Sequence, residues 1–182
     1  MQVFKFGGAS VKDAEGVKNV AAVLKQFPDQ KIAVVVSAMG KTTNLLERLT
    51  KAYFYKTGDA EAILEEVKKY HFDICNDLFA VPTHAIFTDL ENTFVELYWA
   101  IEDEPTQGFD FEYDQIVSMG EIISTKIISA YLNQIGLNNK WVDVRGLIQT
   151  DNTYREGKVD FELTEALVKR NLEKVLLTWT LF

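Results

Sequence analysis

The chain opens and closes with short apolar segments, and helical periodicity dominates the residues between them. Residues 2–6 (QVFKF) combine strand-forming residues with a glycine pair directly after them, which predicts a short strand. Residues 32–38 (IAVVVSA) form an unbroken, largely β-branched run, typical of a strand buried on both faces of a parallel sheet. The pattern predicts two further strands, at 140–144 and 174–179.

Apolar residues spaced by three and four positions predict a series of helices. Asp13 fits the N-cap of a first helix near 14–26, whose apolar stripe ends shortly before Pro28. The same spacing predicts five more helices, at 43–56, 59–79, 84–102, 112–135 and 161–172. Strand–helix–strand units at both ends, with a helical block between them, predict an α/β fold with a parallel sheet and a helical insert.

Composition narrows the class of protein. The 182 residues are 47% apolar and 25% charged, as in soluble globular domains. Cys75 is the single cysteine, so no intramolecular disulfide forms. With neither a signal-peptide pattern nor an apolar run of about 18–20 residues, we predict a cytoplasmic protein with no membrane span. A net charge of −8 argues against nucleic acid or an anionic membrane as a partner.

The first candidate site is the segment VFKFGGAS at 3–10. Lys5 lies two residues before Gly7 and Gly8, so its ammonium can reach over the turn. A glycine pair permits positive φ and lets backbone approach a ligand, and consecutive N–H groups in such a turn bind anions. The alternative is an ordinary tight turn beside a lysine on an edge strand. These residues alone leave both interpretations open.

The second candidate is SAMGKTTN at 37–44, at the end of the apolar strand. It resembles a phosphate-binding P-loop, but that motif needs a glycine where this chain has Val35. What is left is a hydroxyl-rich junction with Ser37, Thr42 and Thr43 at the carboxyl end of a strand, where open α/β sheets bind ligands. The alternative is simple N-capping of the following helix by Thr42 or Thr43.

The third candidate is SMGE at 118–121, within the long helix predicted at 112–135. Ser118 and Glu121 have the spacing of a capping box. Gly120 inside a helix costs about 1 kcal/mol relative to alanine, which indicates close approach by another group. Glu121 has apolar neighbours and needs a cation if it is buried, either a substrate ammonium or a lysine of the protein.

Other chemistry finds little support in the sequence. His71 and His84 have no carboxylate or cysteine partner at ligand spacing, so we interpret both as ordinary helix residues and predict no metal site. No GxSxG motif or comparable nucleophile motif is present.

Four separated stretches, in this order, resemble the aspartokinases of the amino acid kinase family: KFGGAS at 5–10, SAMGKTTNLL at 37–46, MGE at 119–121 and WVDVRGLIQTDNTY at 141–154. The resemblance covers the chain up to about residue 176. It implies an amino acid kinase-like, three-layer fold and transfer of the ATP γ-phosphate, with Mg²⁺, to the side-chain carboxylate of L-aspartate. This reaction is the first step of lysine, threonine and methionine biosynthesis.

The resemblance also implies roles for individual residues. Lys5 is the catalytic cation that contacts phosphate, with Gly7, Gly8 and Ser10 in the same phosphate-binding turn. The substrate aspartate is bound by Ser37 and Thr43, and its ammonium pairs with Glu121. Ala9 is a small departure, because many relatives have threonine there.

The resemblance covers only the amino-terminal, substrate-side portion of the family's kinase domain (1–182 here). Relatives continue into a nucleotide-binding half with a second glycine-rich segment, and then into regulatory ACT domains. We therefore expect an incomplete fold, a chain that is inactive alone, and self-association through an uncovered sheet edge. Two alternatives stay open: another amino acid kinase, and a non-catalytic binding or assembly module that keeps the fold.

Overall fold

The computed structural model describes residues 1–28 and 30–178. Its centre is a pair of parallel strands, β1 (Gln2–Phe6) and β2 (Ile32–Val36), in a register that runs from Gln2 opposite Ile32 to Phe6 opposite Val36. A short 3₁₀ helix, η1 (Gly8–Val11), and helix α1 (Ala14–Leu24) connect them. As the sequence predicts, the Asp13 carboxylate caps α1, accepting the Gly16 N–H over 2.8 Å.

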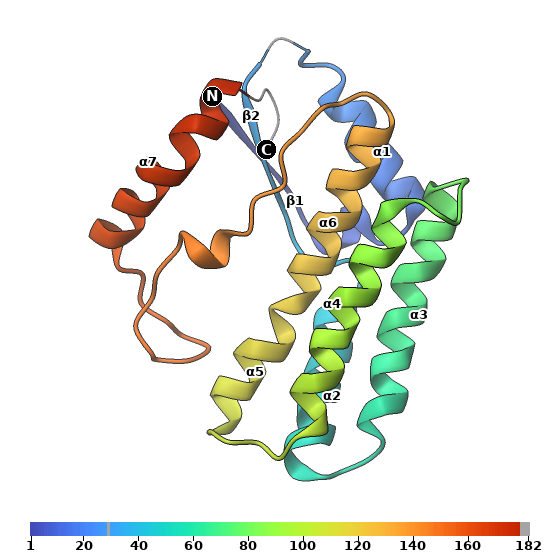
Figure 1. Cartoon of the computed structure of the whole chain (residues 1–182), viewed down its shortest axis with the longest axis vertical. Helices are drawn as coiled ribbons and strands as arrows, with labels where there is room; N and C mark the ends of the chain where they lie inside the picture. The colour runs from blue at the N-terminus through green and yellow to red at the C-terminus, as the bar shows by residue number, and fades with distance from the viewer. Residues whose placement is uncertain (29, 179–182) are drawn as a thin grey trace.

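Most of the remaining chain is helical. Helices α2 (Thr42–Tyr55), α3 (Ala60–Leu78), α4 (Ala85–Glu102), α5 (Phe109–Val117) and α6 (Met119–Gln134) follow in order. In Figure 1, α6 runs beside the strands, α2 to α5 extend mainly below them, and α7 (Phe161–Thr178) lies on the other side of the sheet. The predicted helical insert is therefore confirmed, and the layers of helix and parallel sheet are those of an α/β fold.

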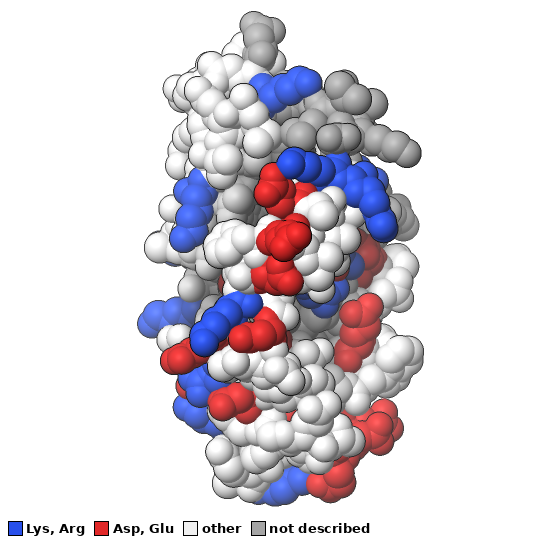
Figure 2. All heavy atoms as spheres, turned by 90° about the vertical axis from the view of Figure 1, so that its left-hand side faces the viewer, with Lys and Arg blue, Asp and Glu red and all other residues white. Residues whose placement is uncertain are grey.

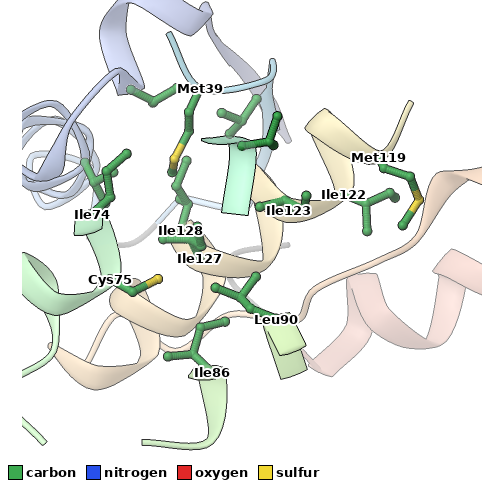
Figure 3. Packing of buried hydrophobic residues seen from close by; sticks show 14 of the residues in the cluster. Met39, Ile74, Cys75, Ile86, Leu90, Met119, Ile122, Ile123, Ile127 and Ile128 are labelled. Carbon is green, nitrogen blue, oxygen red and sulfur yellow. The ribbon is translucent and has the colours of Figure 1, made fainter. Parts of the chain in front are cut away.

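One hydrophobic core joins the strands to the helical block. Figure 3 shows Met39, from the loop after β2, pointing toward Ile128 of α6, with Ile74 of α3 nearby. Cys75, Ile86 and Leu90 bring α3 and α4 into the same cluster. Met39 and Cys75 have no exposed surface, so the loop after β2 is anchored in the core at the centre of the molecule.

The prediction that β2 is buried on both faces is wrong. Phe4 and Phe6 of β1 pack against the core, as does Val34 of β2. On the opposite face, Val3 is 62% exposed and Val35 is 47% exposed. Since side chains alternate across a strand, one face of the sheet meets the core and the other is largely uncovered among the described residues.

The long helix predicted at 112–135 is in fact two helices. Helix α5 begins earlier, at Phe109, and α6 begins at Met119, with Ser118 as the junction between them. The two helices share a similar apolar spacing, which hides the junction from periodicity alone.

The strand predicted at 140–144 does not form. Instead, this segment is irregular up to a 3₁₀ turn, η2 (Val144–Gly146), because its side chains bind α6: the Trp141 Nε1–H donates to Thr125 Oγ1 over 3.0 Å. A cavity of about 180 Å³ separates the segment from β2, with Val34, Ile128 and Trp141 among its walls.

The strand predicted at 174–179 is also wrong where the structure describes it. Helix α7 continues through Thr178, six residues beyond the predicted helix end at 172, while residue 179 lies outside the described residues. An apolar run of this length fits either a strand or a helix, so its period does not decide between them.

Charged side chains of both signs are interspersed over the face of the molecule that Figure 2 shows, and they do not form a continuous basic patch there. Exposed ion pairs such as Lys51–Glu47 and Lys169–Glu165 link neighbouring turns of one helix. Within the described residues, no helix combines the length and the apolar character needed to cross a membrane.

Candidate functional site

The carboxyl ends of β1 and β2 bring two of the sequence motifs together. The Ser37 N–H donates to the Phe6 carbonyl oxygen over 3.1 Å, which extends the strand pairing by one residue. Beyond the strands, the Gly40 N–H donates to the Gly8 carbonyl oxygen over 3.0 Å. The turn after β1 and the loop after β2 therefore lie directly against each other at one edge of the sheet.

The two glycines of the first motif differ in how much space surrounds them. A Cβ built on Gly8 would lie 2.5 Å from the Ala38 carbonyl oxygen, so only glycine fits against the neighbouring loop. At Gly7, no atom lies within 4 Å of such a Cβ, and the position faces open space. Neither residue has a positive φ, so the turn does not use the left-handed backbone that a glycine pair permits, and close approach of the neighbouring loop explains Gly8.

Lys5 and Ser10 flank these glycines and are both exposed. Lys5 shares the uncovered face of the sheet with Val3 and lies opposite Val35 in the strand register. The Ser10 N–H donates to the Gly7 carbonyl oxygen over 2.9 Å, which closes the turn. Among the described residues, no carboxylate forms an ion pair with the Lys5 ammonium, so its charge is available to a ligand.

The loop after β2 leads into α2 without a side-chain N-cap. Lys41 holds the N-cap position, so the interpretation of Thr42 or Thr43 as a capping residue is wrong. The Thr42 side chain is buried, and its hydroxyl donates to the Met39 carbonyl oxygen over 2.7 Å. The next residue, Thr43, is exposed, so the two threonines face in different directions.

The third motif reaches the same loop from the first turn of α6. The Glu121 carboxylate accepts the Ala38 N–H over 3.2 Å through Oε1, and the Ser124 hydroxyl donates to the Ser37 carbonyl oxygen over 2.8 Å. The capping box between Ser118 and Glu121 does not form, because Ser118 makes no side-chain cap and Glu121 turns to Ala38 instead. Of the two cations predicted for Glu121, a lysine of the protein is not found: no lysine among the described residues forms an ion pair with this carboxylate.

Gly120 confirms the predicted close approach. A Cβ at this position would lie 3.0 Å from the Ala38 Cβ and 3.3 Å from the Thr42 Cγ2. Helix α6 therefore packs against the loop after β2 closely enough to exclude larger side chains.

The polar groups that the sequence predicted as ligand contacts gather at this edge. Ser37 and Glu121 are half-buried, while Lys5 and Thr43 are exposed. Within the described part of the chain, no hydrogen bond is made by the Lys5 ammonium, the Ser37 hydroxyl, the Thr43 hydroxyl or Glu121 Oε2. Of the predicted contacts, one cation, one carboxylate oxygen and two hydroxyl groups are thus left at this edge without a hydrogen-bond partner among the described residues.

The fourth motif, at 141–154, contacts the start of α6 next to the candidate site. The Asp143 carboxylate binds the Arg145 guanidinium through Nε and Nη2, at 3.0 and 2.6 Å. This hydrogen-bonded pairing lowers the pKa of Asp143 below its ordinary value. Arg145 also reaches the Met119 sulfur over 3.7 Å, next to Gly120 and Glu121.

Sequence reasoning missed two residues of α3 that lie behind the site. The Tyr70 hydroxyl donates to the Lys12 carbonyl oxygen and lies against Gly40. His71 has no exposed surface; its Nδ1 lies 2.8 Å from the Val67 carbonyl oxygen and its Nε2 lies 3.3 Å from Thr42 Oγ1. Their helical spacing resembles that of core residues, so the sequence carried no signal for this contact.

Burial lowers the pKa of His71 to about 4, which leaves the imidazole neutral at pH 7.

Among the described residues, no group of three or more histidine, cysteine, aspartate or glutamate side chains is placed to hold a metal ion. The groups that are present at this edge, a lysine ammonium, a carboxylate and hydroxyls, can neutralise charge on an anionic or zwitterionic ligand and form hydrogen bonds with it.

An α/β fold with cations, hydroxyls and glycine turns at the carboxyl end of its parallel strands belongs to the class that binds small ligands at that edge. The sequence profile of the amino acid kinase family matches residues 1–178. The chain belongs to the amino acid kinase family.

Its known relatives confirm the resemblance to aspartokinases. Aspartokinase 1, chloroplastic, of Arabidopsis thaliana is 37% identical over 174 residues, covering 92% of this chain and 30% of that protein. The crystal structure of aspartokinase III of E. coli with lysine and aspartate matches with a TM-score of 0.88 and 24% identity, over 100% of this chain and 40% of that one. Its complex with aspartate and ADP gives a TM-score of 0.87 and 25% identity.

The chain therefore spans 28–31% of the length of the Arabidopsis aspartokinases and about two fifths of the solved E. coli chain. At this level the solved structures establish an amino acid kinase-like α/β fold, of which this chain corresponds to a part.

Proposed function

We propose that this chain forms the aspartate-side part of an aspartate kinase, which transfers the ATP γ-phosphate to the side-chain carboxylate of L-aspartate. The observation that carries the proposal is the meeting of three segments at one sheet edge. Lys5 lies in β1 with Gly7 directly after it, Ser37 and Thr43 lie on either side of the loop after β2, and Glu121 comes from α6. The aspartokinase relatives support it, since the E. coli enzyme was crystallised with aspartate and with ADP.

The proposed chemistry fits the groups that are present. A carboxylate has a pKa near 4, so at pH 7 it is ionised and needs no general base to act as nucleophile. Its oxygen attacks the γ-phosphorus, the bond to the β–γ bridging oxygen breaks, and ADP leaves with that oxygen. Catalysis then consists of positioning the reactants and stabilising charge on the phosphoryl group. Lys5 supplies the cation for this.

The residues for the amino acid have complementary chemistry. Glu121 Oε2 carries negative charge toward the substrate ammonium, while Oε1 is held by the Ala38 N–H. The hydroxyls of Ser37 and Thr43 donate to the substrate carboxylates. Because Glu121 is fixed by a backbone amide, its orientation does not depend on the ligand.

The turn at Gly7 and Gly8 fits a phosphate ligand. Gly7 faces open space, so a phosphate oxygen can approach its backbone without meeting a Cβ, and Ser10 lies in the same turn. Mg²⁺ would enter with ATP and would neutralise charge on the phosphoryl group during transfer.

We also propose that residues 1–182 alone lack kinase activity, because they match only 30% of the Arabidopsis relative and 40% of the solved E. coli chain, and the family resemblance puts most of the nucleotide-binding half in the remainder. A cytoplasmic location is part of the same proposal, whereas the Arabidopsis relatives are named as chloroplastic.

A second copy of the chain is the proposed partner, since Val3 and Val35 leave an exposed apolar sheet face. A strictly monomeric species in light scattering, at tens of micromolar, would contradict this last point.

A calorimetric titration of the folded chain with L-aspartate tests the proposed function. Glu121→Gln keeps an oxygen acceptor for the Ala38 N–H but removes the charge, and Glu121→Ala removes both. If Glu121 binds the ammonium, both variants lose aspartate binding, while a purely structural role spares Glu121→Gln. L-Glutamate, titrated in parallel, separates an aspartate kinase from another amino acid kinase. A folded chain that binds neither amino acid contradicts the proposal and favours a non-catalytic module.

A further inference from the structure

Two consecutive residues of α3 contact the site from behind. Tyr70 lies against Gly40, which has a φ of +55°, and its hydroxyl holds the Lys12 carbonyl oxygen. His71 lies beside Thr42, the first residue of α2. The loop that carries Ser37 and leads to Thr43 is thus contacted by α3 as well as by Glu121 of α6.

The hydrogen bonds of His71 determine its tautomer. The Val67 carbonyl oxygen only accepts hydrogen bonds, so Nδ1 must carry the proton that joins the two atoms over 2.8 Å. In the neutral ring, Nε2 is then an acceptor, and its neighbour at 3.3 Å is the Thr42 hydroxyl. The single proton of that hydroxyl is therefore shared in a three-centre hydrogen bond, with its shorter arm to the Met39 carbonyl oxygen at 2.7 Å and its longer arm to His71 Nε2 at 3.3 Å.

Thr42 contacts α3, α6 and the loop after β2 at the same time. Its side chain has no exposed surface, and its Cγ2 would lie 3.3 Å from a Cβ on Gly120 of α6. It therefore fills the space between α3, α6 and the loop. The Thr42 N–H also donates to the Met39 carbonyl oxygen over 3.0 Å, so the same carbonyl closes the first turn of α2.

We propose that His71 is a positioning residue: through the Thr42 hydroxyl, it holds the 37–43 loop in the conformation that presents Ser37 and Thr43 to the amino acid substrate. The part of this inference that concerns substrate rests on the proposed function. The part that concerns the loop does not, because it is read from the contacts of His71 and Thr42 alone.

The test uses two pairs of matched variants. His71→Gln keeps a polar group at the position of Nε2, where it can still contact Thr42, whereas His71→Asn keeps only the group that contacts Val67. Thr42→Val removes the hydroxyl at nearly constant shape, and Thr42→Ser retains it. Hydrogen exchange is measured at the Gly40 and Thr42 amides, which are both hydrogen-bonded in this loop, and at the Ile127 amide in the core of α6 as a reference for global opening.

We expect His71→Asn and Thr42→Val to accelerate exchange at the two loop amides about three- to tenfold beyond any change at Ile127. His71→Gln and Thr42→Ser restore the rate toward that of the wild type. The ¹⁵N shifts of the His71 ring are expected to show the Nδ1–H tautomer. Loop rates that change only in proportion to the core, or the Nε2–H tautomer, would overturn the inference.

Aspartate titration of the same variants separates this inference from the proposed function. Affinity weakened about three- to tenfold by His71→Asn, and restored by His71→Gln, supports both. Unchanged affinity, despite faster loop exchange, overturns the positioning of substrate groups. If the wild type binds no aspartate, the proposed function fails, while exchange at the loop still decides whether His71 holds it. If His71→Asn does not fold, the tautomer measurement on the wild type carries the test, because Thr42→Val also removes the hydrogen bond to the Met39 carbonyl oxygen.

Discussion

The hydroxyl of Ser124 in α6 donates a 2.8 Å hydrogen bond to the carbonyl oxygen of Ser37, a residue 87 positions earlier in the chain. One helical turn before it, Glu121 accepts the N–H of Ala38 across 83 positions. The edge of the sheet that carries the candidate site is therefore held by side chains of a distant helix as well as by its own strands. Substitutions at the contact points are expected to separate structural from ligand-binding roles.

The glycine pair after β1 provides a direct comparison. Gly8→Ala places a Cβ 2.5 Å from the Ala38 carbonyl oxygen, whereas Gly7→Ala meets no atom within 4 Å. We expect Gly8→Ala to lower the free energy of unfolding by about 1–3 kcal/mol or more, because backbone must move to relieve the overlap. Gly7→Ala is expected to leave stability within about 0.5 kcal/mol. Urea denaturation measures both, and equal losses in the two variants would contradict the packing described here.

Lys5 is expected to matter for phosphate transfer and not for folding. It is exposed, and in the described structure it makes no ion pair, so Lys5→Ala changes stability by less than about 0.5 kcal/mol. In any form of the protein that phosphorylates aspartate, we expect the same change to lower kcat about a hundred- to a thousandfold. Lys25→Ala, after the end of α1 and at the opposite edge of the sheet, is the matched control. A coupled assay of ADP release reports the rates.

The buried His71 is expected to lower the free energy of unfolding in mild acid. Burial lowers its pKa from 6.5 to about 4 in the folded protein, so between these values the unfolded chain binds a proton that the native state does not. Its stabilising contribution is complete above pH 6.5 and is lost as the pH falls toward 4. The expected loss in unfolding free energy between pH 7 and pH 5 is about 2 kcal/mol.

Denaturation at both pH values, compared with His71→Gln, isolates this effect. The carboxylates Asp143 and Asp151, whose pKa values are lowered, lose their contribution at a lower pH than His71 does. A wild type and a His71→Gln variant with the same pH dependence would contradict the assignment.

Cys75 is expected to be unreactive in the folded protein. Burial raises the pKa of its thiol to about 12, and the side chain has no exposed surface, so neither a thiolate nor access for a reagent is available. A chromogenic disulfide reagent should therefore label the chain only as fast as it unfolds, and the rate should rise with urea. Rapid labelling in native buffer would show that α3 opens locally.

The sequence predicted the elements near the candidate site well, because their signals are local. Asp13 at a helix start, the glycine pair after β1 and the run at 32–36 each depend on a few neighbouring residues. The close approach at Gly120 was also predictable, since a glycine within a helix needs a reason. These signals placed the first two motifs at the ends of strands, whereas SMGE at 118–121 was predicted within one long helix and lies at the junction of α5 and α6.

The errors arose where tertiary contacts override a local pattern. Trp141 binds Thr125 of α6, and this contact draws the apolar segment 140–144 away from β2. Glu121 has a capping partner at the right spacing but binds the Ala38 backbone instead. His71 is a helix residue as predicted, but its contact with Thr42 depends on how α2 and α3 pack and has no local signal in the sequence.

The contacts of Glu121 and Ser124 have a kinetic consequence. Both close chain segments of more than 80 residues, and such contacts form only after the intervening helices are in place, because long loop closure carries an entropic penalty. The ligand-binding edge is therefore expected to be among the last regions to assemble during refolding. During synthesis, it is not complete until α6 has left the ribosome.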